Sequence, residues 1–163
     1  MVPTVFREMI NGVHDETTLG DLRYIMMSGE PLRGFEIGKF YDRFGTGTTL
    51  VNLYGSIETT LAKSYYVIGQ EDADRTIIPI GKPIDDTELL VLDPGMKKSD
   101  VGLIGEIYIR SQYMPRCYIN DPAGSRKRFV KDPYSDDPKG FLYATGDQGR
   151  LLPDGNIECL GRI

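Results

Sequence analysis

The spacing of apolar residues in the first third of the chain predicts alternating helices and strands. Apolar positions recur at helical spacing in residues 5–13, and residues 22–27 form a short apolar run suited to a buried strand. A second helix is expected next, with Pro31 at its first position and Gly45 at its C-terminal cap. Residues 48–53 are β-branched and apolar and predict another strand. Strand, helix and strand joined by short connections are typical of a parallel sheet.

The rest of the chain changes to short strands separated by turns. Residues 88–92 are apolar, and residues 105–110 alternate between apolar and polar positions, which is typical of a half-buried strand. A hairpin is expected over residues 149–160, because a Pro-Asp-Gly-Asn turn separates its two apolar runs. We therefore expect part of an α/β parallel-sheet subdomain in residues 1–66. A small antiparallel β-barrel-like subdomain is expected in residues 67–163.

Composition and charge narrow the class of protein. With 163 residues and 40% hydrophobic content, the chain is long enough for one folded unit with a buried core. The 24 acidic residues outnumber the 19 basic ones, and the net charge of −5 argues against a nucleic-acid partner. No apolar run approaches the roughly 20 residues that span a bilayer. The N-terminus also lacks the apolar stretch of a signal peptide, so we expect a cytoplasmic protein with no membrane partner.

Several reactive or charged residues are expected to be structural. Two cysteines and a single histidine, His14, predict neither a disulfide framework nor a His-rich metal site. His14 is interpreted as a solvated residue at a helix end. The basic run from Arg126 to Arg128 lies close to several aspartates and is interpreted as a solvated helix face.

The turn after the second predicted strand carries candidate binding residues. Residues 52–60 read NLYGSIETT, and the tight turn within them is expected to open a helix. A helix N-terminus at the carboxyl end of a parallel strand favours an anion, and Glu58 beside it could hold Mg²⁺ together with phosphate oxygens. Taken alone, this motif favours the simpler alternative, in which Ser56 caps a helix and Glu58 and Thr59 are ordinary first-turn residues.

Two further turns follow predicted strands. Residues 143–147 read YATGD, and a rigidly held Asp147 suits bidentate hydrogen bonding to a ribose diol. An Asx-turn, in which Asp147 satisfies its own backbone, is the alternative. Residues 28–30 read SGE, where Gly29 permits close backbone approach, and simple helix capping is again the alternative.

The order of the motifs is more informative than any one of them. The motifs are SGEPL at 28–32, NLYGSIETT at 52–60, GEIYI at 105–109, YATGD at 143–147 and GR at 161–162. In this order they resemble the adenylate-forming enzyme superfamily, and most closely the amino-acid adenylation domains of nonribosomal peptide synthetases. The patterns of those domains read NxYGPTE, GELxIxGxxxxxGYxN, YxTGD and GRxD.

The resemblance implies binding roles for the matching residues. Tyr54 matches the aromatic residue that stacks on adenine, and Glu58 matches the Mg²⁺ ligand. Asp147 matches the residue that binds the ribose hydroxyls, and Arg162 matches an arginine near the ribose. The implied ATP/AMP-binding set is Gly29, Glu30, Asn52, Tyr54, Gly55, Asp147 and Arg162.

The resemblance also implies a pocket for the side chain of the acid substrate. This pocket would be lined from both sides of the tyrosine motif by mainly apolar or small residues. The residues concerned are Met26, Ser28, Leu53, Gly55, Leu61 and Ala62. A medium or large apolar substrate is expected.

Departures from the family pattern bear on activity. The family has threonine at the position of Ile57, where the threonine hydroxyl contacts the α-phosphate. Isoleucine cannot donate this hydrogen bond, and a hydrogen bond to a charged group contributes about 1.5–3 kcal/mol. The sequence contains no phosphate loop ending in lysine and no second domain with a catalytic lysine. We therefore assign no catalytic residue, and we expect these 163 residues to be the later part of a larger core and inactive alone.

In the whole enzyme, the implied reaction converts an amino acid or related acid and ATP into an acyl-adenylate. The acyl group would then pass to the phosphopantetheine thiol of a carrier-protein domain. The remaining partners would be Mg²⁺ and the rest of the adenylation domain. Two alternatives stay open, namely another adenylate-forming ligase for acyl-CoA or aryl acids, and a degenerate, non-catalytic nucleotide-site module.

Overall fold

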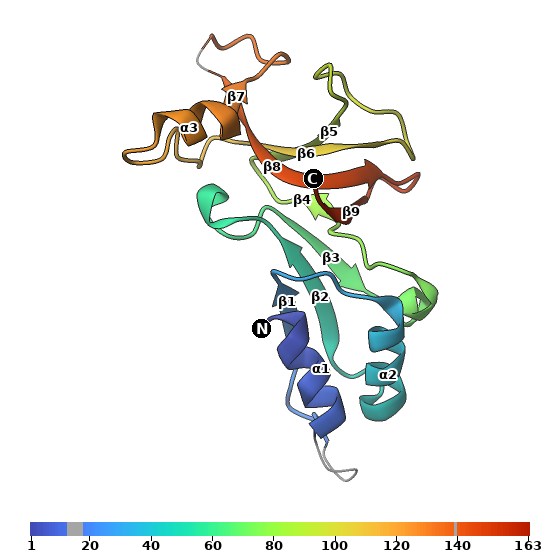
Figure 1. The fold of residues 1–163 in the computed structure, drawn as a ribbon. Coiled ribbons are helices and arrows are strands. Elements are labelled where there is room, and N and C mark those ends of the chain that lie inside the picture. The colour runs from blue at the N-terminus through green and yellow to red at the C-terminus, as the bar shows by residue number, and fades with distance from the viewer. Residues whose placement is uncertain (13–17, 139) are drawn as a thin grey trace.

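The computed structural model, which describes residues 1–12, 18–138 and 140–163, contains two sheets (Figure 1). The first sheet has the spatial order β1 (Tyr24–Ser28), β2 (Thr49–Tyr54), β3 (Ser64–Ile68) and β4 (Lys82–Pro83). The second has the order β5 (Thr87–Leu92), β6 (Ile104–Ser111), β8 (Phe141–Leu151) and β7 (Phe129–Lys131), and β9 (Ile157–Arg162) also pairs with β8. The helices are α1 (Pro3–Gly12), α2 (Gly34–Phe44) and α3 (Pro122–Arg128), and two 3-10 turns are η1 (Ile57–Thr59) and η2 (Gln70–Asp74).

The first sheet forms around a core of apolar side chains that its strands share with α1 and α2. Phe6 of α1 and Phe40 of α2 are fully buried with Met27 of β1 and Leu50 of β2 in a single core cluster. Residues in β1 alternate between buried and exposed, so Met26 faces away from this core. The predicted strands at residues 22–27 and 48–53 are therefore confirmed, with shifts of one or two residues.

The pairing of the first sheet is parallel only at its start. β1 and β2 are parallel with α2 between them, as predicted, whereas β3 and β4 add antiparallel strands. The first sheet therefore continues to Pro83, beyond residue 66, where the sequence predicts the division between subdomains.

Two predictions about helix starts are wrong. Between β2 and β3, whose residues are all described, there is no α-helix but only η1 with three residues, because Thr60 and Leu61 adopt positive φ and the chain turns back into β3. Helix α2 begins at Gly34 rather than at Pro31. The Glu36 carboxylate accepts a 2.8 Å hydrogen bond from the backbone N–H of Arg33, which satisfies a donor at the helix start.

The second sheet is antiparallel, as predicted, and β8 and β9 form the expected hairpin. The fully buried Ile107 and Leu142 belong to two separate packing clusters of this sheet. Among the described residues, β5 and β7 each pair with one strand only. The sheet is thus open in its pairing, and barrel-like closure is not confirmed.

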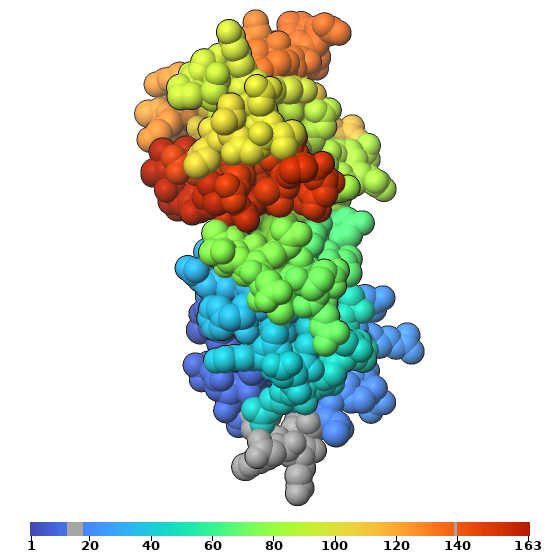
Figure 2. Space-filling model, turned by 90° about the vertical axis from the view of Figure 1, so that its right-hand side faces the viewer, coloured from blue at the N-terminus to red at the C-terminus, as the bar shows by residue number. Residues whose placement is uncertain are grey.

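The two sheets meet where the chain passes Gly81. The Ile80 N–H donates to the Ile157 carbonyl at 2.8 Å, and the Ile157 N–H donates to the Gly81 carbonyl at 3.0 Å. Gly81 has φ +82°, and a Cβ there would overlap the Tyr65 carbonyl. Figure 2 shows the red C-terminal strands lying directly on the green segment that contains β3 and β4.

Within the described ranges, no helix has the length and apolar character needed to cross a membrane. His14 lies outside the described residues. In the basic run, Arg126 and Lys127 are exposed as predicted, whereas Arg128 is half-buried and lines a cavity.

Candidate nucleotide site

The geometry of the site centres on Asp147, which lies in β8 beside the junction of the two sheets. Its Oδ2 accepts a 2.6 Å hydrogen bond from the Tyr54 hydroxyl, and its Oδ1 lies 3.0 Å from Nε of Arg162. Burial raises the pKa of the Tyr54 phenol well above its ordinary value, and the hydrogen bond to Asp147 raises it further. Tyr54 is therefore neutral and a donor, which leaves Asp147 as the acceptor.

The turn around Asp147 is fixed by its neighbours rather than by its own carboxylate. The Asp147 N–H donates to the Thr145 hydroxyl at 3.0 Å, and that hydroxyl donates to the Ile107 carbonyl at 2.7 Å. The Gly146 N–H donates to Glu106 at 2.9 Å, with Gly146 at φ +74°. The Asx-turn alternative is therefore wrong, because Thr145 fills that role and the Asp147 side chain is directed to Tyr54 and Arg162.

Asp147 lines a cavity of about 330 Å³. All seven residues of the predicted ATP/AMP-binding set line it, although they come from three distant parts of the sequence. They are Gly29, Glu30, Asn52, Tyr54, Gly55, Asp147 and Arg162. Ile78 and Ile80 add apolar surface to the same cavity.

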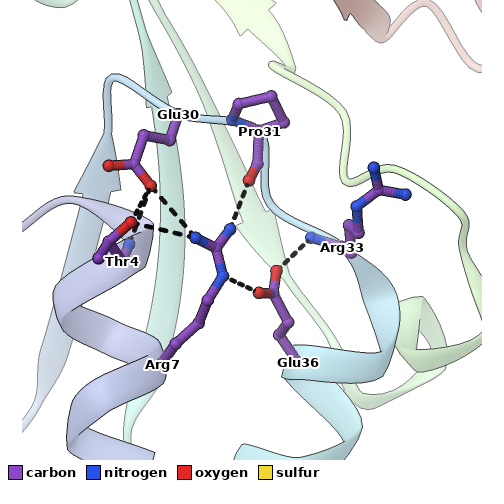
Figure 3. Close-up of polar contacts among 6 residues, drawn as sticks. All are labelled: Thr4, Arg7, Glu30, Pro31, Arg33 and Glu36. Atoms are coloured by element: carbon purple, nitrogen blue, oxygen red, sulfur yellow. Dashed lines mark hydrogen bonds and ion pairs between the residues drawn. The ribbon is translucent and has the colours of Figure 1, made fainter.

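Two of these residues also have structural partners. The Asn52 amide is buried and donates a 2.8 Å hydrogen bond to the Pro79 carbonyl, which ties β2 to the segment before β4. The Glu30 carboxylate accepts hydrogen bonds from the hydroxyl and N–H of Thr4 at 2.6 and 3.0 Å. It also forms a 3.2 Å ion pair with Arg7 (Figure 3). Glu30 therefore anchors the turn that lines the cavity to α1.

Arg7 extends this anchor to α2. Its guanidinium contacts the carboxylate of Glu36 and donates to the Pro31 carbonyl at 3.0 Å (Figure 3). Glu36 is almost completely buried at the start of α2. One arginine thus links α1, the turn after β1 and the first turn of α2.

Glu58 lines a second cavity, of about 400 Å³, which Asp147 also lines. The Tyr118 hydroxyl donates to its Oε1 at 3.0 Å, and the Tyr143 hydroxyl lies 3.5 Å from that of Tyr118. Burial opposes ionisation of Glu58, but hydrogen bonds from its own backbone and from Tyr118 outweigh burial and lower its pKa. Glu58 is therefore an ionised carboxylate facing a polar cavity.

The predicted substrate-pocket residues are only partly brought together. Leu53 lines the 330 Å³ cavity beside Gly55, whereas the other four residues line none of the cavities described above. Met26 and Leu61 are 51% and 73% exposed, and Ser28 shares the exposed face of β1 with Met26. Ala62 is half-buried next to Leu61.

Sequence reasoning does not place Tyr118, Arg128 and Tyr143 in the site, although all three line the cavity around Glu58. A signal is available for Tyr118, because it occupies the tyrosine of the GELxIxGxxxxxGYxN pattern. The local charge pattern around Arg128 favours a solvated surface instead.

Comparison with known proteins identifies the family. The chain belongs to the AMP-binding enzyme family, whose model matches residues 1–119. It is 39% identical over 154 residues to a plipastatin synthase from Bacillus subtilis strain 168, covering 94% of this chain and 6% of the relative. It is 34% identical over 154 residues to bacitracin synthase 2 of Bacillus licheniformis, covering 92% of this chain and 6% of that relative. The chain thus spans about 6% of the length of these curated relatives.

Solved structures agree with this assignment. An NRPS protein that contains adenylation and PCP domains, bound to a vinylsulfonamide inhibitor, matches with a TM-score of 0.79 and 28% identity. The match covers 100% of this chain and 31% of that one. The resemblance to adenylate-forming enzymes that the motifs predict is therefore confirmed.

Proposed function

We propose that this chain forms the nucleotide-binding part of a nonribosomal peptide synthetase adenylation domain. The observation that carries the proposal is the convergence of the seven predicted residues on one cavity next to Asp147. Tyr54 offers a neutral aromatic ring for adenine, and Asp147 offers a half-enclosed carboxylate for the ribose diol. The names of the relatives, which include plipastatin and bacitracin synthases, support the same branch of the family.

In the whole enzyme, the proposed reaction is attack of a substrate carboxylate on the α-phosphorus of ATP. A bond forms between the carboxylate oxygen and phosphorus, and the bond from phosphorus to the pyrophosphate oxygen breaks. The residues of this chain would hold adenine and ribose, so that the α-phosphate is presented at the cavity lined by Glu58. They would contribute positioning rather than a catalytic group.

The residues fit a Mg²⁺ ion bound through one protein carboxylate. Mg²⁺ in nucleotide sites takes one or two carboxylates together with phosphate oxygens and water. Glu58 is ionised and faces the polar cavity, and no cluster of three or more metal-ligating side chains occurs among the described residues. Glu58 would therefore hold the ion only with a phosphate present, and the ion would neutralise phosphate charge.

The substrate and partners are proposed from the same resemblance. Met26, Ser28, Leu53, Leu61 and Ala62 would face the acid side chain, and their apolar character supports an apolar amino acid or related acid. A carrier-protein domain would accept the acyl group on a phosphopantetheine thiol, which the related structure with adenylation and PCP domains supports. The rest of the adenylation domain would cover the exposed face of β1.

The proposed boundary between subdomains lies near residues 84–86 rather than at residue 66. Pairing of β3 with β4 supports this position, because it keeps residues up to Pro83 in the first sheet. The second sheet then begins with β5 at Thr87. A barrel-like form of the second part would need neighbouring segments to close its edges.

Calorimetric titration with adenosine and with ATP plus Mg²⁺ tests the proposed function. We expect the chain to bind both ligands and Asp147→Ala to lose both, because the ribose contact is common to them. Asp136→Ala is the matched control, since Asp136 is exposed and lines neither of the two cavities. Absence of binding by the unaltered chain would contradict the proposal and favour a non-catalytic module.

A further inference from the structure

The cavity around Glu58 contains a guanidinium with unused hydrogen-bonding capacity. Arg128 is the last residue of α3, and its side chain turns away from the solvent that surrounds Arg126 and Lys127. It lines the 400 Å³ cavity together with Glu58, Tyr118 and Tyr143. The position is half-buried, so the charge of Arg128 is only partly hydrated.

The contacts of Arg128 fix its position but leave most of its donors available. Within the described part of the chain, its one hydrogen bond runs from Nη1 to the Ala144 carbonyl at 3.0 Å. An arginine carries five N–H donors in a planar fork. The guanidinium packs against Gly146, where a Cβ would collide with it. The absence of a side chain at position 146 therefore makes room for Arg128 beside Asp147.

The carboxylates of the same cavity already have other partners. Asp147 is paired with Arg162 and Tyr54, and Glu58 accepts from Tyr118. No ion pair joins Arg128 to a carboxylate among the described residues. A positioned, half-buried guanidinium without an anionic partner is suited to bind a phosphate, because its fork matches two phosphate oxygens.

We propose that Arg128 binds a phosphate group of the nucleotide, an inference that rests on the proposed function. It would supply a phosphate contact from the end of α3, in a cavity that Ser56 and Glu58 of the turn around Ile57 also line. The Ile57 side chain is 86% exposed and has no polar atom, so it offers no hydrogen bond to an anion in this cavity. Arg128 would therefore compensate for the missing hydroxyl.

Titration of the chain and of Arg128→Met with adenosine and with ATP plus Mg²⁺ tests this inference. We expect Arg128→Met to lose about tenfold or more in ATP affinity, because a hydrogen-bonded charge is removed. Adenosine affinity should stay unchanged, since adenosine carries no phosphate. Arg128→Lys should recover part of the loss by keeping the charge without the fork. Lys127→Met, at the exposed neighbouring position, should match the unaltered chain.

The same data separate the possible failures. If Arg128→Met and Arg128→Lys bind ATP and adenosine with the affinities of the unaltered chain, the inference is wrong. If both variants weaken the binding of ATP and of adenosine equally, the role of Arg128 is its structural hydrogen bond to the Ala144 carbonyl, and the inference is again overturned. If the unaltered chain binds neither ligand, the proposed function fails first. If Asp147→Ala removes binding of both ligands while Arg128→Met leaves the ratio of ATP affinity to adenosine affinity unchanged, only the inference fails.

Discussion

The Tyr54 hydroxyl donates a 2.6 Å hydrogen bond to the carboxylate of Asp147, although 93 residues separate the two in the sequence. Tyr54 ends the second strand of the first sheet, and Asp147 lies in the long strand β8 of the second sheet. The contact joins the two sheets at Asp147, which lines both cavities. Both stability and ligand binding therefore depend on this pair.

Tyr54→Phe should destabilise the chain while preserving the aromatic ring. The variant removes the donor to a half-enclosed carboxylate, and loss of a hydrogen bond to a charged group costs about 1.5–3 kcal/mol. We expect a fall of this size in the free energy of unfolding, measured by urea denaturation. Tyr113→Phe, at an exposed position, is the control. An unchanged urea midpoint for Tyr54→Phe would show that the contact contributes nothing to stability.

Ile57→Thr should separate stability from phosphate binding. Because the Ile57 side chain is 86% exposed, we expect the free energy of unfolding to stay within about 0.5 kcal/mol. The new hydroxyl should raise ATP affinity and leave adenosine affinity unchanged, as calorimetry with both ligands would measure. Equal affinities for ATP in Ile57→Thr and the unaltered chain would argue against a phosphate next to η1.

Gly55→Ala should unfold the turn after β2. A Cβ at this position would overlap the Leu61 carbonyl, which is backbone and cannot rotate away. The turn must then shift, and we expect a loss of more than about 2 kcal/mol in the free energy of unfolding. Gly47→Ala is the matched control, because a Cβ there meets nothing within 4 Å. Similar thermal midpoints for the two variants would contradict the close approach.

Arg7→Met should weaken the link between α1, α2 and the turn at Glu30. The variant leaves the buried carboxylate of Glu36 without its arginine, and an unpaired charged group costs about 2 kcal/mol or more. Urea denaturation should show this loss, and adenosine affinity should fall as the turn relaxes. Arg126→Met, at an exposed position, should change neither quantity. Unaltered adenosine affinity in Arg7→Met would show that the turn holds its shape without the anchor.

Acid should destabilise the chain through Glu30. Its hydrogen bonds from Thr4, and then its contacts with Arg7, lower its pKa below the ordinary value of 4.5. A carboxyl whose pKa is lower in the folded state stabilises the fold above pH 4.5, and this contribution disappears as pH falls through the folded pKa. Glu30→Gln should therefore flatten the decline of the unfolding free energy below pH 4.5. Parallel pH profiles for Glu30→Gln and the unaltered chain would contradict this role.

Most strands can be predicted from sequence because their residues alternate between a core and an open face. Ile107 and Ile109 of β6 are fully buried, and the expected hairpin of β8 and β9 follows its turn residues. β3 is not predicted, because Tyr65 and Val67, its exposed residues, are themselves large and apolar. A strand with apolar side chains on both faces lacks the alternation that sequence reasoning uses.

The site residues can be identified from motifs, but the motifs do not predict which of these residues contact one another in the folded chain. Nothing local to Tyr54 or Asp147 indicates that they touch, because the contact depends on how the second sheet sits on the first. Sequence reasoning places Arg128 on the surface for the same reason. Its neighbours in sequence are exposed, whereas its neighbours in space are Gly146 and the Ala144 carbonyl.

The hydrogen bonds that join Ile80 and Gly81 to Ile157 also determine when the site can form during folding. Contacts between residues far apart in sequence require closure of a long loop, and such closure is slow compared with the formation of local hairpins and helices. The first sheet and the β8–β9 hairpin can each assemble from nearer segments. The capacity to bind adenosine should therefore emerge last on the refolding pathway, which would make nucleotide binding a kinetic marker for completed docking of the two sheets.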